Sequence, residues 1–230
     1  VWSSGVTAAI APICWGAETP VFTCAGADSI TRLPHQGFIF RTQPISRVQV
    51  AAALRFVLDD GARRLAMMFV QTPFAQISVD VGKEMAAARN IPFASVIYEP
   101  DKTTYRSELD QVLKTNPDYL FLGGLTPDTI VLLRDLYRAS YKGKIMAGAY
   151  SVNTKLLEAL PPDVTEGITT FDPASALESP AYDYARKLAK NPSLDRFTTQ
   201  AYDHVNLSLL AAALEAGGFQ SIEAYDVCLA

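Results

Sequence analysis

The chain is 230 residues long; 49% of its residues are hydrophobic, 19% are charged, and its formal net charge is -4. This composition predicts a globular protein with a substantial core and excludes disordered, collagen-like and coiled-coil sequences. The absence of a cluster of basic residues argues against nucleic-acid binding, and no apolar run approaches the roughly 20 residues that a membrane-spanning helix needs.

The chain begins with VWSSGVTAAIAP, in which two serines and a glycine precede an Ala-rich segment. This pattern predicts a helix whose N-terminus lies near Ser3 and Ser4. The first N–H groups of a helix have no partners within it, and the helix dipole adds partial positive charge there, so an anion would be stabilised. The alternative is that one of these serines only caps the helix.

Helical and strand-like patterns alternate through the middle of the chain. Helices are predicted over 46–60, 75–90, 107–116, 127–140 and 154–160, and strands over 63–70, 93–98, 118–124, 144–150 and 166–171. Strands this uniformly apolar are covered on both faces, which predicts an α/β fold with a doubly wound parallel sheet.

Ligands of such sheets bind where loops leave the carboxyl ends of the strands. These loops read QTPFAQ, EPDKTTY, GGLTPD and GAYSVN. Ordinary turn chemistry explains most of their residues. The rings of Phe74 and Tyr150 fit a ligand wall as well as they fit a core.

Two polar joints that contain proline, at 41–44 and 169–173, indicate that the chain passes between two lobes. The sequence predicts that 43–170 forms a complete second lobe. Residues 1–42 and 171–230 would form an incomplete first lobe, because the strands at 20–26 and 38–41 are too few for an independent sheet. Further helices of that lobe are predicted at 180–190 and 198–216.

Motifs for common catalytic and cofactor chemistry are missing from the sequence. It has no Gly-rich phosphate loop, no G-x-G-x-x-G after a strand and no G-x-S-x-G nucleophile elbow. Cys14, Cys24 and Cys228 have neither metal-ligand nor redox spacing, and the sequence leaves open a disulfide between Cys14 and Cys24. We therefore expect a binding protein rather than an enzyme, with no cofactor and no metal.

The order of segments resembles the type I periplasmic solute-binding proteins, specifically the branched-chain amino-acid (leucine/isoleucine/valine) receptors of ABC transporters. The resemblance covers essentially the whole chain, and its most specific part is YEPDKTTYRSELDQVLKTNPDYLFLGG. It implies two lobes joined by three crossings that close on a ligand, with strands of the family before Val1 and after Ala230. It also implies a periplasmic or lipid-anchored location, ABC permease and ATPase subunits as partners, and contact with the membrane only through the transporter.

The resemblance further implies a set of ligand-binding residues. Ser3, with Ser4 beside it, takes the position that binds the ligand's carboxylate, in accord with anion binding at helix N-termini. Ala25 and Ala27 occupy a second contact loop and offer backbone groups, although Ala27 lacks the hydroxyl that relatives often have. The apolar walls of the cleft would be formed by Phe74, Leu125 and Phe197.

Tyr150 takes the place of the acidic residue that commonly meets the ligand's ammonium group. A buried ammonium without a carboxylate is costly. The ligand is therefore expected to be an amino acid paired with Asp28 or with an acid outside this chain, or else an aromatic or branched organic acid that lacks the amino group. A different class also fits the fold, namely an amide or amino-acid sensor, including one attached to a DNA-binding head.

Overall fold

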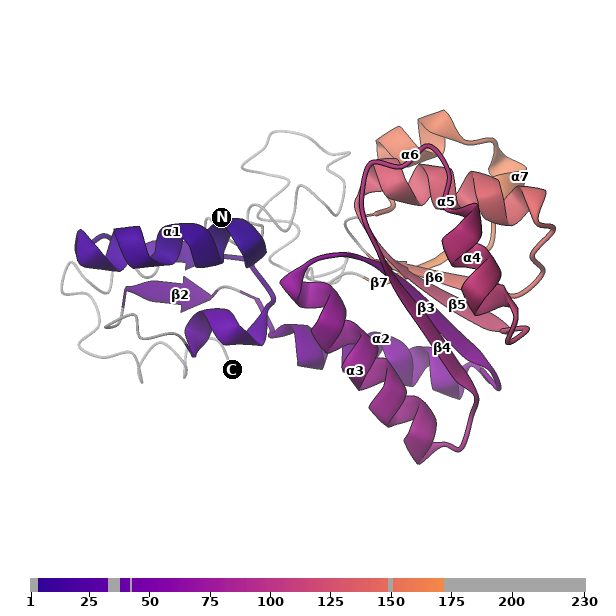
Figure 1. The fold of residues 1–230 in the computed structure, drawn as a ribbon, viewed down its shortest axis with the longest axis horizontal. Helices are drawn as coiled ribbons and strands as arrows, with labels where there is room; N and C mark the ends of the chain where they lie inside the picture. Colours follow the sequence, from indigo (N-terminus) through magenta and orange to yellow (C-terminus); the bar gives the residue numbers. More distant parts are fainter. Residues whose placement is uncertain (1–3, 33–37, 42, 149–150, 172–230) are drawn as a thin grey trace, which may run out of the picture. The chain divides into compact units, whose positions relative to one another are not determined.

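The computed structural model describes residues 4–32, 38–41, 43–148 and 151–171 (Figure 1). These residues fall into two compact units, the first of 4–25, 38–41 and 43, and the second of 26–32, 44–148 and 151–171. The second unit thus includes 26–32, a segment that the predicted lobe boundaries assign to the first lobe. The Ser46 amide donates a hydrogen bond to the Gly26 carbonyl over 2.7 Å, which holds this segment against the second unit.

The described part of the first unit contains one helix and a pair of strands. Helix α1 (Ser4–Gly16) begins where the sequence predicts, and β1 (Val21–Thr23) pairs in parallel with β2 (Ile39–Arg41). The rings of Phe22 and Phe40 stack at 5.2 Å between centroids. Between Cys14 and Cys24, both described, there is no disulfide bond.

The second unit is built on a five-stranded sheet in the order β4-β3-β5-β6-β7, and all its strand pairs are parallel. The strands are β3 (Leu65–Val70), β4 (Phe93–Tyr98), β5 (Tyr119–Gly123), β6 (Lys144–Gly148) and β7 (Thr169–Phe171). The helices are α2 (Ser46–Asp59), α3 (Pro73–Ala88), α4 (Arg106–Leu113), α5 (Thr126–Arg138), α6 (Thr154–Ala159) and α7 (Pro162–Thr165), with a 3₁₀ helix η1 (Asp28–Thr31). The predicted doubly wound parallel sheet is confirmed.

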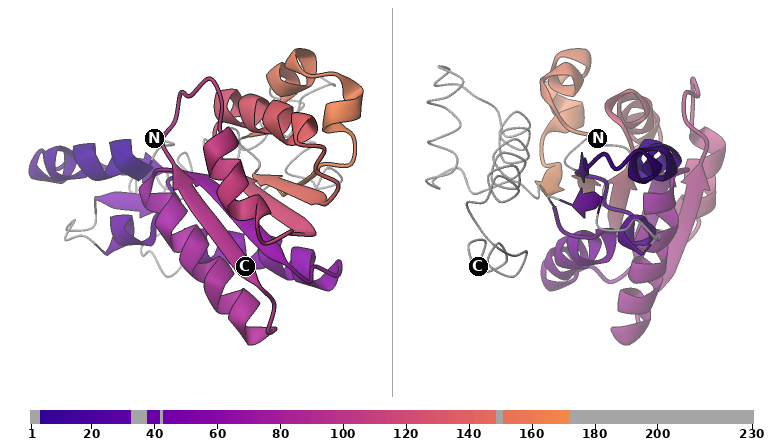
Figure 2. Two further views of the ribbon diagram at one scale, coloured as in Figure 1. Left: turned by 45° about the vertical axis from the view of Figure 1, so that its right-hand side comes forward. Right: turned by 90° about the vertical axis from the view of Figure 1, so that its left-hand side faces the viewer.

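Helices cover both faces of this sheet (Figures 1 and 2). Residues of α2 and α3 form one apolar cluster with Leu65, Met67 and Phe69 of β3. Residues of α4, α5 and α6 form a second cluster with the alternate β3 residues, Ala66 and Met68. Because β3 is buried on both faces, all six of its residues are apolar, which is why the run LAMMFV shows no alternation.

The structure departs from the predicted elements mainly at their ends. Helix α4 ends at Leu113 rather than 116, because Asn116 has a left-handed backbone (φ 48°) that stops the helix. Asn90 (φ 54°) lies just beyond the end of α3 in the same conformation. Two further elements, η1 and α7, were not predicted, because each has only four residues and segments this short show no periodicity.

The pair Lys102–Glu108 makes stability depend on pH. Lys102 Nζ lies 2.6 Å from Glu108 Oε1, and this hydrogen bond lowers the pKa of the largely buried Glu108 carboxyl below its ordinary value of 4.5. A lowered folded-state pKa stabilises the fold above pH 4.5, and the contribution is lost as the pH falls through the folded value. In urea unfolding between pH 7 and pH 3, Glu108→Gln should therefore lose less stability on acidification than the parent protein. Identical losses would show that the pair does not contribute.

Candidate functional site

The strand order of the second unit reverses between β3 and β5, and we call the region outside the carboxyl ends of these two strands the crevice. From β3 the chain continues outward on one side to β4, then crosses back to β5 on the other side of β3. Ligands of doubly wound sheets bind at this reversal, outside the carboxyl ends of the strands. The loops that leave β3 and β5 here contain Gln71 and Thr72, and Gly124 and Leu125.

Two of the predicted wall residues lie at this crevice. Phe74 belongs to the first turn of α3, which follows β3, and Thr72 caps that turn by accepting a hydrogen bond from the Ala75 amide. Leu125 is the N-cap residue of α5, which follows β5, and its side chain is 58% exposed. The structure therefore brings Phe74 and Leu125 to adjacent strand ends and leaves an apolar side chain open to solvent there.

The segment that contains Ala27 passes beside Phe74. A Cβ atom on Gly26 would lie 3.5 Å from the Phe74 ring and 2.9 Å from Ser46 Oγ. Ala27 itself is buried, so only its backbone could meet a ligand. Asp28 Oδ1 is buried too and has no hydrogen-bond partner among the described residues.

In the first unit, two threonines link helix α1, which begins at Ser4, to the segment that contains Ala25. Thr7 Oγ1 in α1 lies 2.9 Å from Thr23 Oγ1 at the end of β1, and both side chains are buried. This bond holds the start of α1 beside the segment that follows β1. The Ala25 amide donates to Thr23 Oγ1 over 2.9 Å, so its carbonyl, and not its N–H, is the group that Ala25 can offer.

The remaining predicted site residues, Ser3, Tyr150 and Phe197, lie outside the described residues, as do Cys228 and the helices expected at 180–190 and 198–216.

Two buried serines that were not among the predicted site residues, Ser46 and Ser151, lie beside the segments that form the crevice. Ser151 is fully buried, and its hydroxyl donates to the Gly124 carbonyl over 2.6 Å. Ser46 is fully buried at the start of α2, beside Gly26. Their positions in the sequence could have indicated this role, since Ser151 follows β6 and Ser46 follows the predicted crossing between the lobes at 41–44.

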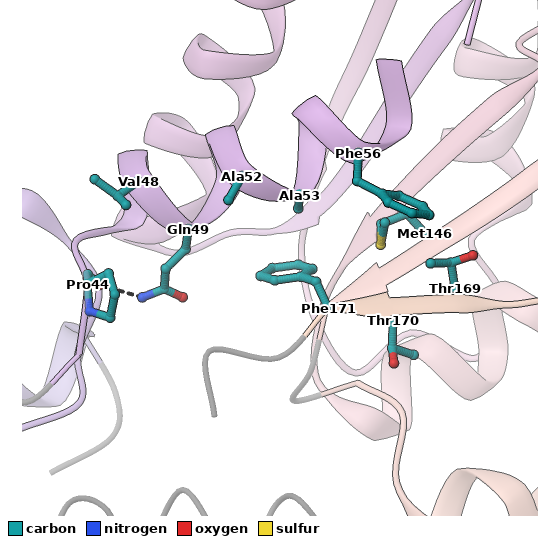
Figure 3. A pocket seen from close by; sticks show the side chains of 10 residues that line it. All are labelled: Pro44, Val48, Gln49, Ala52, Ala53, Phe56, Met146, Thr169, Thr170 and Phe171. Carbon is teal, nitrogen blue, oxygen red and sulfur yellow. Dashed lines mark hydrogen bonds between the residues drawn. The ribbon is translucent and has the colours of Figure 1, made fainter. Parts of the chain in front are cut away.

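A separate hollow of about 370 Å³ lies between α2 and the edge strand β7 (Figure 3). Its walls are Pro44, Val48, Gln49, Ala52, Ala53, Phe56, Met146, Thr169, Thr170 and Phe171. None of the predicted site residues lines it, and its walls carry no charged group that could bind a carboxylate. We therefore do not assign the ligand to it.

The part of the chain that the structure describes shows neither a metal-binding cluster nor a membrane-spanning helix. It contains no group of three or more His, Cys, Asp or Glu side chains suited to a metal ion. None of its helices combines the length and the apolar character that crossing a membrane requires.

Known proteins resemble this chain in sequence and in fold. The chemotactic signal transduction system substrate-binding protein BasB of Halobacterium salinarum is 26% identical over 215 residues, which are 89% of this chain and 50% of BasB. The leucine binding protein LivK of Thermotoga maritima superposes with a TM-score of 0.77 at 20% identity, over 95% of this chain and 63% of LivK. A solute binding protein of R. palustris in complex with 4-hydroxybenzoate gives 0.77 at 19% identity, over 95% and 61%.

The chain thus spans about half the length of BasB and less than two thirds of these two solved structures. All three relatives are binding proteins, in agreement with the prediction of a binding protein rather than an enzyme. Residues 1–227 match the family described as periplasmic binding protein. The chain therefore belongs to the periplasmic binding protein family, and its fold is of type I.

Proposed function

We propose that this chain is the ligand-capturing part of a solute receptor for an ABC importer, located in the periplasm or anchored outside the cell. Its ligand is an amino acid or a related small carboxylate, which it would pass to permease and ATPase subunits. The observation that carries the proposal is the placement of Phe74 and Leu125 at the adjacent carboxyl ends of β3 and β5. Two apolar side chains there suit the hydrophobic part of such a ligand.

The carboxylate is assigned to the N-terminus of α1. This helix has 13 residues and begins at Ser4, directly after Ser3, and its dipole places partial positive charge at this end, which favours an anion. Support comes from the relatives, since leucine and 4-hydroxybenzoate share a carboxylate and differ in whether they carry an amino group.

The amino group separates the two candidate ligand classes. A buried carboxylate oxygen of Asp28 with no hydrogen-bond partner among the described residues favours an amino acid, because an ammonium could donate a hydrogen bond to it. Tyr150, in the place of the family's acidic residue, favours an organic acid that lacks the amino group, since a phenol cannot neutralise an ammonium.

Calorimetry on the complete gene product with leucine, its 2-keto acid and 4-hydroxybenzoate tests the proposal. We expect at least one to bind and mass analysis to return it unchanged. Asp28→Asn should weaken leucine by about tenfold or more and leave the keto acid unaffected if Asp28 meets the ammonium. Failure of all three to bind, or turnover that a single Ser or His substitution abolishes, would refute the proposed function.

A further inference from the structure

Gly123 ends β5 and Gly124 follows it, and an aromatic side chain from a different strand packs against each of these glycines. A Cβ atom on Gly123 would overlap the ring of Phe69, and one on Gly124 would overlap the hydroxyl of Tyr98. Because successive residues of a strand face opposite sides of the sheet, the two aromatic side chains approach from opposite faces. The backbone that leads into Leu125 is therefore held between them.

Phe69 connects this backbone to the other proposed wall of the crevice. It lies directly opposite Gly123 in the register of β3 and β5 and is 1% exposed. Its ring also packs against Phe74, with 6.0 Å between the centroids. One buried ring thus contacts Phe74 on one side and the strand end before Leu125 on the other.

Tyr98 reaches the same loop from the far side of β3. It pairs with Val70 in the register, one position beyond Phe69, so its side chain must cross β3 to meet Gly124. Its ring packs on Tyr105 at 4.6 Å, and Tyr105 in turn donates a hydrogen bond to Asp128 in the first turn of α5. Tyr98 therefore cannot swing away from the loop.

The Tyr98 hydroxyl limits the position of Gly124 by steric contact and not by a hydrogen bond. The side chain is 2% exposed, and its oxygen has no hydrogen-bond partner among the described residues. Burial raises the pKa of Tyr98, so the hydroxyl stays protonated. Its steric contact is with Gly124, whose carbonyl Ser151 holds from another direction.

We propose that Phe69 and Tyr98 are positioning residues that set the separation between Phe74 and Leu125, and with it the size of ligand side chain that the crevice admits. The inference rests on the proposed function. A displacement of Gly124 also displaces Leu125, which follows it in the chain. The Leu125 carbonyl is in turn bonded to α5, because the Thr129 amide and hydroxyl each donate a hydrogen bond to it over 3.0 Å.

The test uses Gly124→Ala, Tyr98→Phe and the double variant of the complete gene product. Gly124 has no left-handed backbone, and its next nearest neighbour, Thr129 Oγ1, lies at an ordinary 3.5 Å, so the Tyr98 hydroxyl is the one close obstacle to a methyl group. Adding the methyl moves the loop away from Tyr98, toward the face on which Phe74 packs. The crevice should then narrow.

The readout is the ratio of affinities for leucine and phenylalanine, and for their 2-keto acids, measured by calorimetry. We expect Gly124→Ala to shift the ratio about tenfold or more toward leucine or its keto acid, and Tyr98→Phe in the same chain to return it to within about threefold of the parent value. Tyr98→Phe alone removes only an unpartnered hydroxyl, so it should fold and shift the ratio about threefold toward the larger side chain. Gly16→Ala, which adds a methyl where no atom lies within 4 Å, is the matched control and should leave the ratio unchanged.

The possible outcomes separate this inference from the proposed function. If the parent protein binds the probes but neither Gly124→Ala nor Tyr98→Phe alters the ratio, the positioning role is wrong and the receptor function stands. A double variant that keeps the shifted ratio of Gly124→Ala also overturns the role of Tyr98. If the parent protein binds neither pair, the proposed function fails, and this inference fails with it.

Discussion

Phe69→Ala is expected to lower the free energy of unfolding of the second unit by about 4 kcal/mol, within the range for large-to-small changes at buried aromatic residues. The Phe69 ring is 1% exposed and packs edge-on against Phe121, with 5.2 Å between the centroids, as well as against Phe74. Its removal leaves a cavity between β3, β5 and α3 that the surrounding strands cannot close. Urea unfolding followed by far-ultraviolet circular dichroism measures the loss.

Phe56→Ala is the matched control for this prediction. Phe56 lies on α2 with its side chain 51% exposed, so truncating it removes little buried area and should cost less than about 1 kcal/mol. Equal losses from Phe56→Ala and Phe69→Ala would contradict the packing described for β3.

Asp128→Ala is expected to destabilise the second unit by about 3 kcal/mol, because it leaves the buried Tyr105 hydroxyl and the part-buried Asp101 amide without their acceptor, at about 1–3 kcal/mol each. Asp128 is 3% exposed, and its Oδ1 accepts hydrogen bonds from the Tyr105 hydroxyl over 2.5 Å and from the Asp101 amide over 3.0 Å. Asp101 has a left-handed backbone (φ 62°), which turns its N–H toward this carboxylate. The acid thus fixes the loop between β4 and α4.

Asp128→Asn keeps an acceptor oxygen in place and should lose less than half as much stability as Asp128→Ala. Asp163→Ala removes a comparable contact at the surface, where the exposed Tyr137 hydroxyl donates to Asp163 Oδ2 over 2.8 Å. That variant should show no measurable change in its urea midpoint. If it loses as much as Asp128→Ala, burial is not the source of the effect.

The fold of the second unit was predictable because local patterns determine it. Apolar runs such as LAMMFV indicate strands buried on both faces, and the intervening helical periods fix their parallel direction. The positions of Phe74 and Leu125 follow from the same rule, since each residue lies in a loop that follows a predicted strand.

Contacts that depend on register between strands could not be predicted. Tyr98 and Gly124 are 26 positions apart and meet only because β4 and β5 both align with β3, which no local pattern reveals. The hydrogen bond from the Ala25 amide to the Thr23 hydroxyl could not be predicted either, because it depends on the rotamer of the Thr23 side chain. The main-chain hydrogen bond from Ser46 to Gly26, within the second unit, joins residues that no local pattern pairs.

The most direct test of the account compares a carboxylate ligand with its amide. Whichever of leucine, its keto acid or 4-hydroxybenzoate binds most tightly should be titrated beside its carboxamide, with the parent protein and with Ser3→Ala. A charge-assisted hydrogen bond at the start of α1 is worth about 1.5–3 kcal/mol, and 1.4 kcal/mol is tenfold, so the parent should prefer the acid by about tenfold or more and Ser3→Ala should lose most of that preference. Equal or tighter binding of the amide by the parent protein, or an undiminished preference for the acid in Ser3→Ala, would contradict the claim that the opening turn of this chain holds a carboxylate.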